Sequence, residues 1–171
     1  MEMNQRDDSQ RTLRRQLRQR LEWGRMTILV LVAVSLLNQI LLWCGARFHF
    51  LVSPAMTYYI NWLARQLGMG GFKVIATILT LLLYVAYLAC WLLSARKKEW
   101  MMAALGLYGV DSVLLVVFAL VLLENPASCL LEVLVHCLVL ALLFFAFQAA
   151  ERLSKIPRRR RPAQNASDSQ T

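Results

Sequence analysis

Residues 128–150 read SCLLEVLVHCLVLALLFFAFQAA. This stretch of 23 residues is long enough to cross the hydrocarbon core of a bilayer as a helix, which takes roughly 20 apolar residues. Three further segments share its length and apolar character, at 26–44, 72–94 and 101–123. One such segment is compatible with a buried helix of a soluble domain, but four in a chain of 171 residues predict a membrane protein.

The composition agrees with four spans. Hydrophobic residues make up 58% of the chain and charged residues 17%, against roughly 45–50% and about 25% in an average soluble domain. A disordered regulator is excluded as well, because such a chain combines its charge with low hydrophobicity. The net charge of +9 must therefore lie outside the apolar segments.

Basic residues lie mainly on one side of the predicted spans. Seven arginines precede residue 26, three basic residues lie in 95–100 and six follow Ala150, sixteen in all. The other side carries Arg47, Arg65 and Lys73. By the positive-inside rule this asymmetry predicts a multi-pass protein of the plasma membrane with both termini in the cytoplasm.

Two polar arms flank the membrane domain of residues 26–150. In residues 1–25, Leu13, Leu17 and Leu21 recur at four-residue spacing among arginines, which predicts a basic amphipathic helix on the anionic inner leaflet. Residues 151–171 form a polybasic tail whose composition predicts disorder. Anionic lipids are the expected partners of both arms. Nucleic acid is not, because Trp23 is the only aromatic residue among the basic residues of the two arms, and stacking of successive bases needs more than one ring.

The loop between the first two spans is long enough to hold a helix, predicted at about 54–67. Ser53 and Pro54 provide an N-cap and a first helical position, and Gly68 a stop. One face of this helix is apolar and the other polar. The apolar face comprises Met56, Tyr59, Ile60, Leu63 and Leu67, opposite Asn61, Arg65 and Gln66. The expected fold class is an all-α membrane protein, a four-transmembrane-helix bundle with an extracytoplasmic interfacial helix between spans 1 and 2.

Ionisable and polar residues inside the spans are the candidate functional residues, because they are costly to insert and are often functional. Asn38, Tyr84, Asp111 and His136 fall at similar depths. Glu132 lies four residues before His136, on the same helical face. The short turn at 124–127 makes spans three and four antiparallel neighbours, so Asp111 and His136 are close in depth and an Asp–His hydrogen bond is compatible with the sequence.

These residues admit three interpretations. In the first, they form a polar network that sets the packing of the bundle, in a non-enzymatic protein that acts through lipid or protein partners or as a homo-oligomer. In the second, Asp111 and His136 serve a proton- or ion-coupled transporter. In the third, Asp111, Glu132 and His136 hold a metal in an intramembrane hydrolase, although His49 is the only other histidine. The first is favoured, with no cofactor and no catalytic residue assigned.

Small residues offer two further hypotheses. Cys44 and Cys129 both fall near the outer face, where an oxidising environment allows a disulfide, although packing is the favoured role of all four cysteines. Ala103, Gly106 and Gly109 form a smooth ridge for close helix contact, either within the chain or between protomers.

Several short stretches carry a family resemblance. They are Leu36–Leu42, Gly45, Phe48–Pro54, Tyr58–Tyr59, Cys90–Ser94 with the basic residues that follow, and the regions of Asp111 and His136. With these, the chain resembles a group of small uncharacterised four-span integral membrane proteins of Gram-positive bacteria, over roughly residues 25–155. The resemblance implies the fold and a bacterial origin, and it implies no activity.

Overall fold

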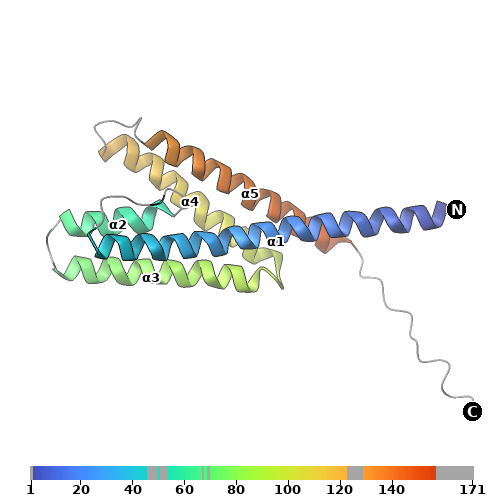
Figure 1. Ribbon diagram of the computed structural model, residues 1–171, viewed down its shortest axis with the longest axis horizontal. Coiled ribbons are helices and arrows are strands. Elements are labelled where there is room, and N and C mark those ends of the chain that lie inside the picture. Colours follow the sequence, from blue (N-terminus) through green and yellow to red (C-terminus); the bar gives the residue numbers. More distant parts are fainter. Residues whose placement is uncertain are drawn as a thin grey trace, which may run out of the picture.

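The computed structural model describes residues 2–45, 50, 54–66, 68, 70–122 and 129–156. Five helices follow one another in this part of the chain (Figure 1). They are α1 (Glu2–Trp43), α2 (Ala55–Gln66), α3 (Gly70–Leu93), α4 (Lys98–Leu122) and α5 (Leu130–Lys155). All but α2 contain a stretch long and apolar enough to cross a membrane. The predicted all-α class, with four spans and a shorter helix between the first two, is confirmed.

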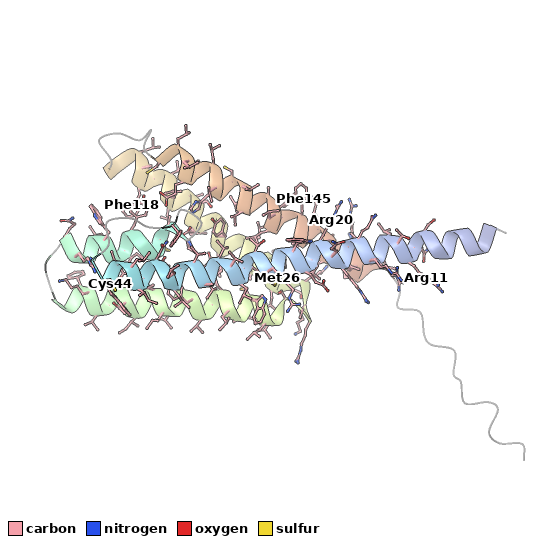
Figure 2. All side chains as sticks on the ribbon, viewed as in Figure 1. Arg11, Arg20, Met26, Cys44, Phe118 and Phe145 are labelled. Carbon is pink, nitrogen blue, oxygen red and sulfur yellow. The ribbon has the colours of Figure 1, made fainter. Side chains whose placement is uncertain are left out.

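Apolar side chains cover the outside of this bundle. In the most apolar stretch of each long helix, only about a third of the residues are buried by the rest of the protein. Large side chains such as Met26, Val113 and Phe145 are more than half exposed, and Figure 2 shows Phe145 on the outer side of α5. Monomeric soluble proteins rarely expose apolar patches of such extent. The fold is therefore that of a multi-pass membrane protein.

The first helix continues from the basic arm into the first span without a break. α1 has 42 residues, and Figure 1 shows its N-terminal part leaving the bundle along the line of the span. The sequence predicted a basic amphipathic helix within residues 1–25, and its continuity with the span was not part of that prediction. Leu17 of the arm is buried although most of its neighbours are exposed. We call the end of the bundle formed by residues 9–25, 94–99 and 150–156 the basic end.

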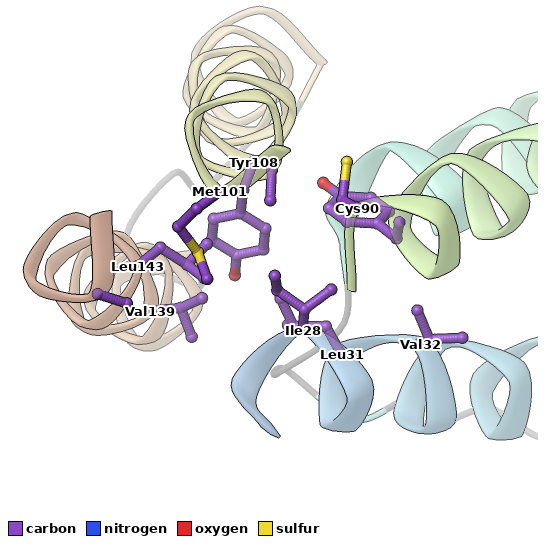
Figure 3. Packing of buried hydrophobic residues seen from close by; sticks show 11 residues of the cluster. Ile28, Leu31, Val32, Cys90, Met101, Tyr108, Val139 and Leu143 are labelled. Atoms are coloured by element: carbon purple, nitrogen blue, oxygen red, sulfur yellow. The ribbon is translucent and has the colours of Figure 1, made fainter. Parts of the chain in front are cut away.

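The hydrophobic core lies in the half of the bundle nearer the basic end, and all four long helices contribute to it. Figure 3 shows Ile28 and Leu31 of α1 close to Tyr108 of α4, with Val139 and Leu143 of α5 beside them. Each of these side chains is at most 4% exposed. This cluster holds the helices together at the end where α4 and α5 approach α1.

A glycine permits the close approach of α1 and α5. A Cβ atom added at Gly24 would lie 2.1 Å from the Cβ of Ala146. The backbone of α1 at Gly24 therefore lies directly against the Ala146 side chain of α5. The predicted ridge on α4 plays no such part within the chain, because a Cβ at Gly106 or Gly109 meets no atom within 4 Å. Only Ala103 of that ridge packs against the core.

Away from the basic end, α4 and α5 diverge from α1 and α3, and α2 lies between the two pairs (Figure 1). Glycines with positive φ follow the helices on either side of this region: Gly45 (φ 78°) follows α1 and Gly68 (φ 67°) follows α2. Such angles suit glycine at a helix C-terminus. The Arg65 guanidinium donates to the Leu42 carbonyl, which joins the C-terminal turns of α2 and α1.

Candidate functional site

The side of α2 that includes Asn61 faces the protein. Thr57, Asn61 and Ala64 are at most 6% exposed, whereas Trp62 and Leu63 are 38% and 40% exposed. The sequence predicted two faces for this helix without assigning either of them to the bundle; Arg65 and Gln66 of the polar face are exposed, whereas Asn61 is buried. Asn61 is buried because lipid is as apolar as leucine and offers polar groups no hydrogen bonds, so polar groups find their partners inside the bundle.

Asn61 joins α2 to both of the helices beside it. Its side-chain amide nitrogen donates to Gln39 Oε1 of α1 at 3.2 Å and to Thr80 Oγ1 of α3 at 2.8 Å. It also lies 2.8 Å from the Thr57 carbonyl oxygen, one turn back in α2. The Gln39, Asn61 and Thr80 side chains are all buried. This contact sets the rotation of α2 about its own axis.

Asp111 of α4 caps the N-terminus of α2. The Ala55 backbone N–H donates to its Oδ2 at 2.9 Å, and the Met56 N–H donates to its Oδ1 at 2.7 Å. The first N–H groups of a helix have no partner within the helix, and the positive end of the helix dipole attracts a negative charge. A carboxylate from another helix therefore performs the role predicted for Ser53, which lies outside the described residues.

His136 of α5 completes this contact. Its Nε2 lies 3.3 Å from Asp111 Oδ2, and its Nδ1 lies 2.9 Å from the Glu132 carbonyl oxygen. Because a carbonyl oxygen only accepts, Nδ1 carries a proton, and one further proton lies between Nε2 and Oδ2. The result is a buried ion pair at the N-terminus of α2.

Two tyrosines surround this pair. The Tyr108 ring stacks on His136 with centroids 5.1 Å apart, and its buried hydroxyl has no hydrogen-bond partner within the described part of the chain. Tyr59 of α2 donates to Glu132 Oε2 at 3.4 Å. Burial, together with the nearby Glu132 carboxylate, raises the pKa of the Tyr59 phenol above its ordinary value. Tyr59 therefore remains a neutral donor, and it joins α2 to α5.

Asn38 and Tyr84 lie outside this contact. The Asn38 side chain holds the backbone of Phe50: its amide donates to the Phe50 carbonyl at 2.8 Å, and its oxygen accepts from the Phe50 N–H at 2.7 Å. Tyr84 donates to the Ser35 carbonyl at 3.0 Å, which joins α3 to α1. The residues predicted to share one layer thus act in three separate places, and only Asp111 and His136 meet.

The arrangement does not favour a metal centre. Asp111 and His136 bind each other and α2, while the Glu132 carboxylate is directed to Tyr59. Within the described ranges, no three His, Cys, Asp or Glu side chains are grouped as metal ligands. Cys44 and Cys129 are both free thiols, the first exposed and the second buried. His49 lies outside the described residues.

Sequence reasoning missed the partners of α2. Gln39, Thr80 and Asn61 form one of its two main contacts, yet Gln39 and Thr80 were not among the candidate residues, and Asn61 was assigned only to the polar face of its helix. These residues could have been recognised from the sequence, because a glutamine and a threonine within apolar spans need hydrogen-bond partners as much as a carboxylate does.

Comparison of the chain with protein-family models, with curated proteins and with solved structures finds no match.

Replacing Asn61 with alanine is expected to loosen α2. The substitution removes three hydrogen bonds and leaves the buried Gln39 carbonyl without its donor, so we expect a loss of about 1–3 kcal/mol in the free energy of unfolding. Denaturant titration in detergent micelles measures this quantity. Gln66→Ala, an exposed polar position at the end of the same helix, serves as the control. Equal losses in the two variants would show that Asn61 does not anchor α2.

Proposed function

We propose that the chain is a non-enzymatic integral protein of a bacterial plasma membrane, with both termini in the cytoplasm, that acts through lipid or protein partners or as a homo-oligomer. The four apolar helices and the sixteen basic residues on one side of them support the location and orientation. The resemblance to small four-span proteins of Gram-positive bacteria supports the bacterial origin.

One observation carries the non-enzymatic assignment: the ionisable groups inside the bundle are used to hold α2. Both Asp111 carboxylate oxygens accept backbone N–H groups, and both His136 ring nitrogens have partners. Neither Asp111 nor His136 lines the cavity at the basic end or the cavity beside Arg65 and Lys73. A catalytic or transporting group needs access to its substrate, whereas a packing group does not.

A proton-coupled transporter is the second candidate, because Asp111 and His136 share a proton within the apolar part of the bundle. Proteoliposomes that enclose a pH-sensitive dye test it. Under an imposed proton gradient, we expect the wild-type protein to carry no more protons than protein-free liposomes. A flux that Asp111→Asn abolishes, at unchanged melting temperature, would replace our proposal with the transporter.

The proposed orientation predicts which thiols react from outside the cell. Cys44 is exposed at the end of α1 opposite the basic end. In a variant that keeps Cys44 alone, an impermeant maleimide should label intact cells. In a matched variant whose single cysteine is Ser154→Cys, at an exposed position of the basic end, labelling should require permeabilised cells. The reverse pattern would place both termini outside.

A further inference from the structure

The basic end contains a groove of about 870 Å³ that the contacts around α2 do not use. It lies between α1, the turn from α3 to α4 and the C-terminal part of α5. Six cationic side chains line it: Arg14, Arg18, Arg25, Arg96, Lys97 and Lys98. The positive end of the α4 dipole lies at the same place, because α4 begins at Lys98.

The carboxylates that line this groove do not balance its positive charge. They are Glu22 and Glu99, which leaves a formal excess of four positive charges among the lining residues. No salt bridge joins a described residue to Arg18, Arg25, Arg96, Lys97 or Lys98. Concentrated positive charge within a concave site attracts an anion more strongly than the same charges spread over a flat surface.

Arg25 provides the most specific sign of a ligand. Its guanidinium lies 5.8 Å from the centre of the Trp91 ring, which holds the planar group at the wall of the groove. Its Nε is buried, with no hydrogen-bond partner in the described part of the protein. A buried donor without an acceptor is costly, and a guanidinium suits the oxygens of a phosphate group.

The rest of the lining indicates an amphiphile. Leu21, Ala150 and Leu153 provide apolar wall beside the cations. Trp23, Trp91 and Trp100 occur at the same end, and tryptophan is enriched at the level of lipid headgroups. The described lining includes no aromatic ring on which a nucleic-acid base could stack. A phospholipid combines the phosphate and the apolar chains that these surfaces match.

We propose that this groove binds the phosphate headgroup of an anionic phospholipid from the leaflet at the basic end, with Arg18 and Arg25 among its ligands. The inference rests on the proposed function, because it names a lipid partner of the same membrane protein and the site where that lipid binds. Basic pockets of this kind at the ends of membrane helices suit lipid headgroups.

Native mass spectrometry of the full chain, titrated with phosphatidylglycerol in detergent micelles, tests the proposal. The groove variant is Arg18→Gln with Arg25→Gln. The matched control, Arg15→Gln with Arg20→Gln, removes the same charge from exposed positions of the same helix that do not line the groove. We expect one bound lipid in the wild type, roughly tenfold or more weaker binding in the groove variant, and less than about a twofold change in the control. Arg25→Lys, which keeps the charge, should retain most of the affinity.

Three results would overturn the assignment. Equal weakening in the two double variants would mean diffuse attraction to charge. Binding of inorganic phosphate alone, with displacement of the lipid, would mean a free-phosphate site. Displacement by a short single-stranded RNA of equal charge would mean a nucleic-acid site. None of these three results changes what the cysteine-labelling and proton-flux experiments measure. A failure of this site can therefore be distinguished from a failure of the proposed function.

Discussion

Replacing Asp111 with alanine is expected to cost on the order of 3–5 kcal/mol in the free energy of unfolding, the usual penalty for removing one partner of a buried ion pair. Two backbone N–H groups at the start of α2 lose their acceptor, and the His136 imidazolium is left buried without its carboxylate. Unfolding of the purified protein by denaturant in detergent micelles measures the loss.

The neighbouring residue provides the control for Asp111. The Ser112 hydroxyl donates to the Tyr108 carbonyl within α4 and contacts no other helix through that bond. Ser112→Ala should therefore change the free energy of unfolding by less than about 1 kcal/mol. If Asp111→Ala loses no more stability than Ser112→Ala, the ion pair does not hold α2, and the two charged groups within the bundle serve another purpose.

Replacing Gly24 with alanine is expected to separate α1 from α5. The new Cβ would lie 2.1 Å from the Cβ of Ala146, which no side-chain rotation relieves because both atoms are attached directly to the backbone. Overpacking of this kind typically costs about 1–3 kcal/mol. The same denaturant titration measures the loss, and the reciprocal change Ala146→Gly should restore most of it.

Gly106 is the matched glycine for this experiment. It also lies within a helix, but an added Cβ there meets nothing within 4 Å. Gly106→Ala should leave stability unchanged or raise it by up to about 1 kcal/mol, because alanine is the better helix former. Equal effects at Gly24 and Gly106 would contradict the close approach of α1 and α5.

The spans and the short helix were predictable because their signals are strong and local. Runs of about 20 apolar residues leave few alternatives to a membrane helix. Pro54 and Gly68 bracket a short helical segment, and α2 runs from Ala55 to Gln66. The proximity of Asp111 and His136 also followed from simple geometry, because only a few residues separate the two apolar segments in the sequence, which predicts antiparallel neighbours.

The side of α2 that packs on the bundle was not predicted from the sequence. In water, the apolar face of an amphipathic helix packs inward. Beside lipid, an apolar face gains little by being buried against the protein. Leu63 therefore remains exposed, whereas Asn61 is buried against the bundle. The capping role of Asp111 was equally hidden, because Asp111 and Ala55 are 56 residues apart and a pattern along one helix carries no information on such a contact.

Amide hydrogen exchange of α2 in the Asp111→Asn variant tests most directly whether the buried ionisable groups hold this helix. An asparagine can accept only one of the two N–H groups and cannot neutralise His136. We predict faster exchange over residues 55–66 than in the wild type, with the exchange of α3 unchanged. Unchanged exchange across α2 would contradict the account and return Asp111 and His136 to the candidates for transport.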